Sequence, residues 1–229
     1  MLLHHYWRVF RRVGVSALST VCRKVFQPLL ESPRSRSSGW PASRYAMYRH
    51  LSGASARYNL NHDGLHLSIS NSRVLINVLG FAGSVQDCAW PEYDLCSLDL
   101  PDEAFDSISS DQVLEHLHGS PFAALAESAR VVRKGGAVIH TTVFSHHLHP
   151  KPFDHWRFSP QGLARLAESA GLEVLEVGGM DNALGRLLLK SRCLWQIKVS
   201  DHPVNPLGRL LTRNRGRLPT HVWLIARKP

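Results

Sequence analysis

Residues 105–144 read FDSISSDQVLEHLHGSPFAALAESARVVRKGGAVIHTTVF, and they contain a strand–helix–strand pattern. Phe105–Ser110 is a short, half-apolar segment that predicts a strand. Pro121–Val132 carries apolar side chains every three or four positions and predicts a helix, with a stop at the Gly135-Gly136 pair. The apolar, β-branched run Ala137–Phe144 predicts the next strand. A strand, a helix and a strand in this order imply a right-handed crossover between parallel strands.

The same alternation continues on both sides of this stretch. Ser159 and Pro160 predict the N-cap and first turn of a helix that runs to Ala170 before Gly171. Further strands are expected at Arg73–Leu79, Leu172–Val177 and His221–Ala226, and further helices at Tyr45–Leu51 and around Ala183–Lys198. The sequence therefore predicts an α/β fold, Rossmann-like, with a mostly parallel sheet, an antiparallel last strand and helices on both faces.

Charge is concentrated at the two ends of the 229-residue chain. Residues 1–50 hold nine Lys or Arg and one acid, and residues 203–229 hold six Lys or Arg and no acid, whereas the middle is mildly acidic. This distribution argues against a nucleic-acid-reading core. It predicts basic ends that can contact an anionic membrane surface. The four scattered cysteines predict reduced thiols in an intracellular protein.

The N-terminal segment forms a region of its own. Residues 1–44 are expected to be a basic extension that ends in a linker rich in Ser, Pro and Arg, and residues 45–229 a single domain with its recognisable core at 73–182. The first thirty residues have three open interpretations: a transit peptide, a membrane-surface helix, or a helix packed on the domain. The expected location is cytoplasmic and membrane-peripheral, or alternatively an organelle. No apolar window reaches the roughly 18 residues of a membrane span.

Four segments in register resemble a known family. Leu98–Asp106, Ser110–Leu117 and Arg130–Gly136 are similar to the LPF-x-D-x-SFD, VLEH and RVLKPGG segments of class I methyltransferases of the type 11 group. His149–Pro160 resembles the H-x-x-P-x-D-[YF]-[WY]-RF-[ST]-P stretch of a subgroup tied to glycan and lipopolysaccharide modification. The resemblance implies S-adenosylmethionine as cofactor and a small molecule or glycan as methyl acceptor.

The resemblance also implies residue roles. Asp94 falls where the family's adenine-contacting acid lies, and Leu95 would flank the adenine ring. Asp111 and Gln112 would end a strand beside the reactive sulfonium. The turn that contains Gly80, Gly83 and Ser84 would be the glycine loop that approaches the methionine part of the cofactor.

The first half of this pattern departs from the family. Asn77 stands where an acid usually precedes the glycine loop, and the short stretch from Gly83 to Asp94 leaves no room for the expected helix and strand. Asp87 and Glu92 are the candidates for the acid that grips the ribose. These departures keep an alternative open, in which a catalytically inactive methyltransferase-like protein serves as a binding or assembly partner.

Candidate catalytic residues follow the third apolar strand. His149 is a candidate general base with Asp154 as its orienting acid, and the alternative is that Asp154 and Arg157 form a structural ion pair. Glu115 and His116 either line the site or cap a turn, and Trp156 and Phe158 either stack on a substrate or belong to the core. No metal site is predicted from the cluster of His140, His146, His147, His149 and His155, because no acid or Cys joins them at ligand spacing.

Overall fold

The computed structural model describes residues 40–41, 43–60, 63–150, 153–181, 198–199, 206–214 and 217–229. They fall into two compact units, one formed by residues 50–180 and 216–229, the other by residues before 50 and within 181–215. Most of the predicted basic extension and the helix expected around Ala183–Lys198 lie outside the described residues. The expectations for location and membrane contact therefore stay predictions.

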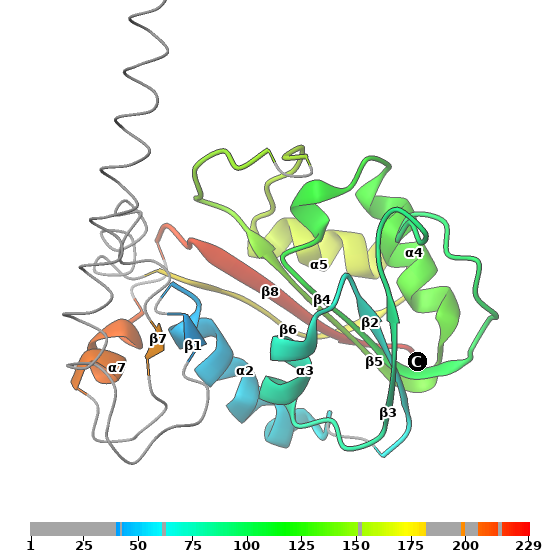
Figure 1. Ribbon diagram of the computed structural model, residues 1–229, viewed down its shortest axis with the longest axis horizontal. Helices are drawn as coiled ribbons and strands as arrows, with labels where there is room; N and C mark the ends of the chain where they lie inside the picture. The colour runs from blue at the N-terminus through cyan, green and yellow to red at the C-terminus, as the bar shows by residue number, and fades with distance from the viewer. Residues whose placement is uncertain are drawn as a thin grey trace, which may run out of the picture. The chain divides into compact units, whose positions relative to one another are not determined.

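The larger unit is built on a six-stranded sheet in the order β3-β2-β4-β5-β8-β6 (Figure 1). β2, β3, β4 and β5 are parallel, whereas β8 runs antiparallel to both of its neighbours, β5 and β6. The strands are β2 (Leu65–Ile69), β3 (Ser84–Cys88), β4 (Phe105–Asp111), β5 (Val132–Val143), β6 (Glu173–Met180) and β8 (His221–Arg227). The predicted fold class, including the antiparallel last strand, is confirmed.

Helices cover both faces of this sheet. α4 (Pro121–Val131) and α5 (Pro160–Ser169) lie on one face, and α3 (Arg73–Leu79) lies on the other with the part of α2 (Tyr45–Tyr58) that follows Arg49 (Figure 1). The hydroxyl groups of Ser120 and Ser159 accept hydrogen bonds from backbone N–H groups and cap α4 and α5, each of which begins with a proline. A candidate membrane-spanning helix is not found among the described residues.

The predicted first strand is wrong. Arg73–Leu79 forms the helix α3, with Leu75, Ile76, Val78 and Leu79 buried. A short apolar run suits a buried helix turn as well as a buried strand, so periodicity does not separate the two. The first strand is instead β2, just upstream, and the recognisable core begins before residue 73. Because α3 leads through Gly80 into β3, the helix and strand expected to be missing are both present.

The expected glycine stop after α4 is also wrong. α4 ends at Val131 and β5 starts at once with Val132, so Gly135 and Gly136 lie inside the strand. Gly135 has φ +77°, and a Cβ on Gly136 would lie 2.6 Å from the backbone oxygen of Asp106 on β4. Glycine is therefore required for strand geometry and close packing rather than for capping.

Two buried histidines form side-chain hydrogen bonds inside the sheet. The ring of His66 on β2 contacts the Ser107 and Ser109 hydroxyls on β4 at 2.7 and 2.8 Å. His140 on β5 contacts the Ser110 hydroxyl at 2.7 Å and Ser128 of α4 at 3.1 Å. Burial lowers the pKa of His66 to about 3 and that of His140 to about 4, so both are neutral.

The smaller unit contains a two-stranded antiparallel ribbon of β1 (Trp40–Pro41) and β7 (Lys198–Val199). Tyr45, Val199 and Leu211 are buried together, and Trp40 packs against them. Leu211 ends the short helix α7 (Pro206–Leu211). Trp40 and Pro41 were expected in the linker, so the last part of that predicted segment has regular structure.

Candidate active site

The carboxyl ends of β2, β3 and β4 meet at one edge of the sheet, where ligands bind in open α/β folds. The turn after β2 has Ser70 and Asn71 at φ 54° and 58°, left-handed values that glycine usually supplies. Asp87, near the end of β3, accepts hydrogen bonds from the Ser68 hydroxyl at 2.5 Å and the Asn71 N–H at 2.9 Å. This carboxylate fixes the turn in its left-handed shape without a glycine.

The assignment of Gly80, Gly83 and Ser84 to the cofactor loop needs correction. Gly80 caps the end of α3, and Gly83 and Ser84 lead into the first residues of β3, at the opposite edge of the sheet. A Cβ on Gly83 would lie 2.0 Å from the backbone oxygen of Gly64, so glycine there allows two chain segments to approach. The assignment rested on a strand at Arg73–Leu79. With β2 as the first strand, the corresponding loop is Ser70–Ser72.

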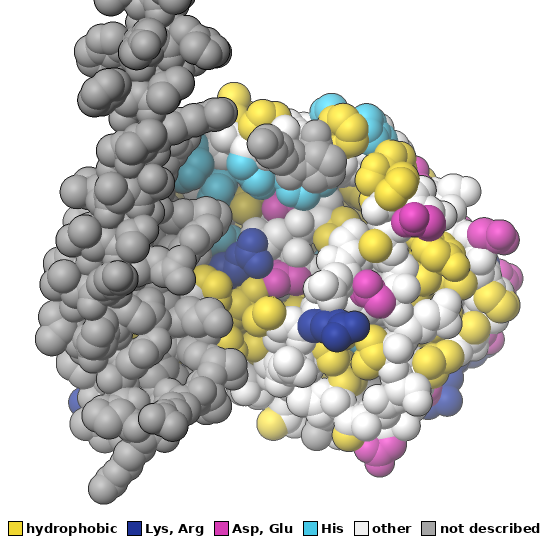
Figure 2. All heavy atoms as spheres, in the orientation of Figure 1, with side chains coloured by type: hydrophobic (Ala, Val, Ile, Leu, Met, Phe, Trp, Pro, Cys, Tyr) yellow, Lys and Arg dark blue, Asp and Glu magenta, His cyan; other side chains and the backbone are white. Residues whose placement is uncertain are grey.

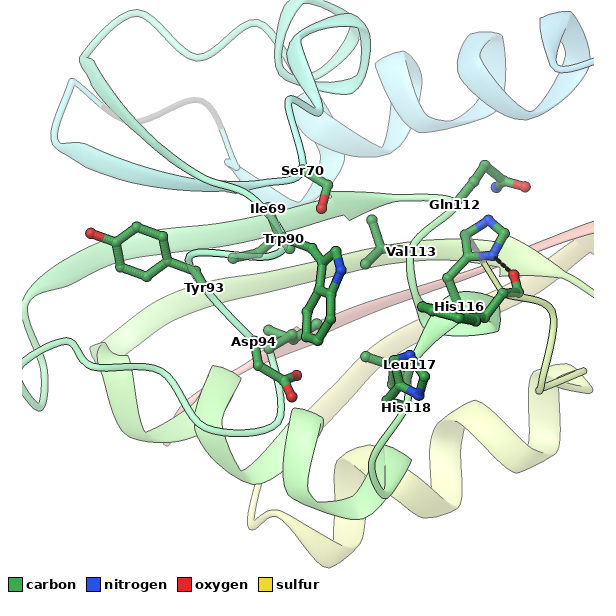
Figure 3. Close-up of a pocket in the computed structure, with 12 residues that line it drawn as sticks. Ile69, Ser70, Trp90, Tyr93, Asp94, Gln112, Val113, His116, Leu117 and His118 are labelled. Atoms are coloured by element: carbon green, nitrogen blue, oxygen red, sulfur yellow. Dashed lines mark hydrogen bonds between the residues drawn. The ribbon is translucent and has the colours of Figure 1, made fainter. Parts of the chain in front are cut away.

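A cavity of about 140 Å³, partly open to solvent, lies at this edge (Figure 3). Its aromatic walls come from Trp90, Tyr93 and Phe153. The sequence-predicted residues Asp94, Leu95 and Gln112 all line it, together with Ser70 and His116. The structure thus brings three predicted cofactor residues together around one cavity.

Backbone contacts position these side chains. Asp94 Oδ1 accepts the Cys96 N–H at 2.9 Å, which fixes the turn that carries Asp94 and Leu95. Gln112 has φ 61° and donates from its backbone and side chain to Thr141 on β5, at 3.0 Å each. Asp111 accepts the Thr141 hydroxyl at 2.7 Å and is not among the residues that line the cavity.

Asp154 and Arg157 form the ion pair expected as the alternative interpretation. The Asp154 side chain is 3 % exposed, and both terminal nitrogens of Arg157 donate to it. The guanidinium holds the pKa of Asp154 well below its usual range. Asp154 also accepts the His149 N–H at 2.9 Å, and its Oδ2 lies 3.6 Å from His149 Nδ1. The pair therefore fixes the loop that carries His149.

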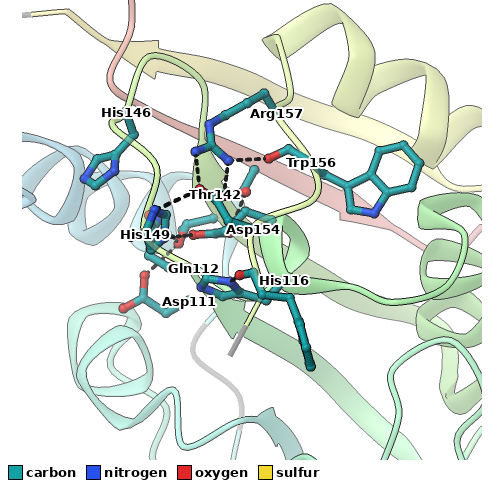
Figure 4. Close-up of polar contacts among 12 residues, drawn as sticks. Asp111, Gln112, His116, Thr142, His146, His149, Asp154, Trp156 and Arg157 are labelled. Carbon is teal, nitrogen blue, oxygen red and sulfur yellow. Dashed lines mark hydrogen bonds and ion pairs between the residues drawn. The ribbon is translucent and has the colours of Figure 1, made fainter. Parts of the chain in front are cut away.

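Glu115 was missed as a partner of the histidines. It lies in a short 3-10 helix after β4, η1 (Leu114–His116), is fully buried, and accepts the Thr142 hydroxyl at 2.7 Å. Its Oε1 is 4.0 Å from His149 Nε2. The adjacency could have been anticipated, because the ends of β4 and β5 are neighbours in a parallel sheet. Figure 4 shows His116, His149 and Asp154 close together.

The remaining candidate site residues differ in their exposure to solvent. Histidine side chains gather on one side of the molecule (Figure 2). His140 is inside the sheet, whereas His147 and His155 are exposed. Phe158 belongs to the core. Trp156 is 37 % exposed, and its indole N–H donates to the Leu117 carbonyl at 3.0 Å.

Known proteins resemble this chain in part of its sequence and in its fold. Residues 56–140 match the family model described as a methyltransferase domain. No curated protein matches the chain by sequence. Among solved structures, similarity extends to a candidate methyltransferase of Haloferax volcanii in complex with the methyltransferase activator Trm112, with TM-score 0.53 and 16 % identity over 81 % of this chain and 92 % of that one.

Two further structures have the same fold. A candidate sarcosine dimethylglycine methyltransferase of Galdieria sulphuraria has TM-score 0.51 and 14 % identity over 80 % of this chain and 85 % of that one. Phosphoethanolamine N-methyltransferase 2 of Haemonchus contortus has TM-score 0.51 and 15 % identity over 82 % of this chain and 56 % of that one. The chain thus has the Rossmann-like fold of class I methyltransferases, and its residues 56–140 match the type 11 methyltransferase domain.

Proposed function

We propose that the protein transfers a methyl group from S-adenosylmethionine to a small-molecule or glycan acceptor. The observation that carries this proposal is the cavity at the carboxyl edge of the sheet, which Asp94, Leu95 and Gln112 line together. His116 belongs both to this cavity and to the cluster around His149, so a bound cofactor would lie next to the candidate acceptor side. This arrangement favours an enzyme over the inactive alternative.

The cofactor would lie across the ends of β2, β3 and β4. Asp94 would accept a hydrogen bond from the adenine amino group, with Leu95 and the aromatic wall against the ring. Asp87, at the end of β3, is the proposed ribose-side acid, and Ser70–Ser72 would face the methionine part. Gln112 would border the sulfonium, and Asp111 would support it through Thr141.

Methyl transfer needs alignment more than activation, because the sulfonium is already a good leaving group. The acceptor atom forms a bond to the methyl carbon while the carbon–sulfur bond breaks, and S-adenosylhomocysteine leaves. The proton of an acceptor hydroxyl or amine would pass to His149, which the Asp154–Arg157 pair positions. Trp156 offers a ring for packing against a sugar.

The adenine assignment is tested by calorimetric titration with S-adenosylhomocysteine. Asp94→Asn keeps an acceptor for the Cys96 N–H but removes the charge, so we expect about tenfold weaker binding, or roughly 1.4 kcal/mol. Asp99→Asn, an exposed acid in the same segment, is the matched control and should bind like the wild type. Equal affinity of all three proteins would refute the assignment, and an absence of saturable heat would refute cofactor binding.

A further inference from the structure

We propose that Glu115, His116 and His149 bind one divalent transition-metal ion. One ligand atom from each of these side chains lies within 4.8 Å of the other two. The separation between Glu115 Oε1 and His149 Nε2 is 4.0 Å. Donors around a tetrahedral ion with metal–ligand distances of 2.0–2.2 Å are roughly 3.3–3.6 Å apart, so side-chain rotations would bring the three ligand atoms to binding distance.

Each of the three donors is oriented by a second partner. Thr142 donates to Glu115 Oε2, which directs Oε1 toward His149. His116 Nδ1 contacts the Phe153 carbonyl, and His149 Nδ1 contacts the His147 carbonyl at 3.2 Å. A carbonyl oxygen only accepts, so both Nδ1 atoms must carry the proton, and each Nε2 keeps its lone pair. Partners of this kind are the usual supports of metal-binding histidines.

Burial also suits a metal ligand. Glu115 is fully buried, and its charge contributes to the raised pKa of Arg157. Its carboxylate is held by the Thr142 hydroxyl beside the two histidines.

The donor set favours one class of metal. Two imidazole nitrogens and one carboxylate oxygen suit Zn²⁺, Mn²⁺ or Fe²⁺, whereas Mg²⁺ prefers an all-oxygen shell. Three protein ligands leave at least one position open, as in catalytic rather than structural sites. The half-exposed side of His149 provides access from solvent.

One consequence rests on the proposed function. An acceptor hydroxyl in the open position would have a lowered pKa and would lose its proton to solvent before its oxygen attacks the methyl carbon. His149 would then be a ligand, and its Nε2 would not accept the proton. In that case a chelator would abolish methyl transfer, whereas it would leave transfer intact if His149 acted only as a base.

Metal binding is tested on the full chain after chelator treatment and dialysis. Zn²⁺ is titrated in competition with a chromophoric chelator, with Mg²⁺ as the comparison ion. We expect one tight Zn²⁺ equivalent per chain, weakened at least about 100-fold by Glu115→Gln and about 10- to 100-fold by Thr142→Val, which removes only the supporting hydroxyl. His147→Ala is the matched control, because it keeps the backbone carbonyl and should bind as tightly as the wild type.

The proposal is overturned if wild type binds Zn²⁺ no better than Glu115→Gln and Thr142→Val. His149→Ala, at a half-exposed position, replaces Glu115→Gln if the buried substitution unfolds the chain, which circular dichroism would reveal. Titration of the same samples with S-adenosylhomocysteine separates the two proposals. Cofactor binding without tight Zn²⁺ binding refutes only the metal site, and tight Zn²⁺ binding without cofactor binding refutes only the proposed function.

Discussion

Asp154→Asn should destabilise the protein because it leaves the Arg157 guanidinium without its anionic partner. The Asp154 side chain is 3 % exposed, and that of Arg157 is 25 % exposed. Breaking a fully buried pair costs about 3–5 kcal/mol, and the remaining exposure of Arg157 reduces this to roughly 2–3 kcal/mol. Asparagine keeps an acceptor for the His149 N–H, so the loss reports the charge pair.

The free energy of unfolding is measured by urea titration at pH 7. Asp102→Asn is the control, because Asp102 also pairs with an arginine, Arg130, but its side chain is 75 % exposed. We expect that control to change stability by less than about 0.5 kcal/mol. A double-mutant cycle with Arg157→Met should give a coupling energy of about 2 kcal/mol between the two partners.

The pH dependence of this effect has a definite sign. The folded-state pKa of Asp154 lies below its unfolded value, so the pair stabilises the protein above about pH 4 and this contribution is lost as the pH falls. The destabilisation by Asp154→Asn should therefore shrink in acid. Equal stability of the Asp154→Asn and Asp102→Asn proteins at pH 7 would show that the Asp154–Arg157 pair does not stabilise the fold.

Two further predictions concern the sheet and its covering helices. Gly136→Ala should destabilise by about 1–3 kcal/mol, because the added Cβ would lie 2.4 Å from Val132 Cγ1. Gly53→Ala, in the middle of α2 with nothing within 4 Å of the new Cβ, should stabilise by about 0.5–1 kcal/mol. Urea titration checks both, and the same sign for the two substitutions would contradict the packing argument. The buried neutral histidines predict a separate acid effect: because their folded-state pKa values lie below the unfolded value near 6.5, stability should fall below pH 6.5 by up to about 1.4 kcal/mol per pH unit for each histidine. His140→Gln should show a shallower slope between pH 6.5 and 4.5, and equal slopes would count against the burial argument.

The strands of the larger sheet from β4 onward were predictable because they are apolar runs, and the helices between them have clear N-caps. β2 was not, because its sequence Leu-His-Leu-Ser-Ile buries two polar residues. His66 is satisfied by Ser107 and Ser109, and a single chain segment does not reveal a partner on another strand. α3 was mistaken for a strand because its buried residues, Leu75, Ile76, Val78 and Leu79, dominate so short a segment.

The candidate site was likewise predicted only in part. Asp94, Leu95 and Gln112 were identified through motifs at fixed distances along the chain, and all three line the cavity. The turn after β2, now the proposed cofactor turn, was not recognised from the sequence because Ser70 and Asn71 adopt left-handed backbone without the glycine that marks such turns. The ends of β4 and β5 were expected to be neighbours, but the approach of Glu115 to His149 depends on the conformation of the segments after these strands, which periodicity does not provide.

The proposed function places the cofactor in the cavity beside Asp94. A crystal structure of the protein with S-adenosylhomocysteine would show whether it lies there. We expect adenine density against Leu95 with its amino group at the Asp94 carboxylate, and the homocysteine part between Ser70–Ser72 and Gln112. Density at the opposite edge of the sheet, beside Gly80–Ser84, would contradict the account, as would a cavity that stays empty at saturating ligand.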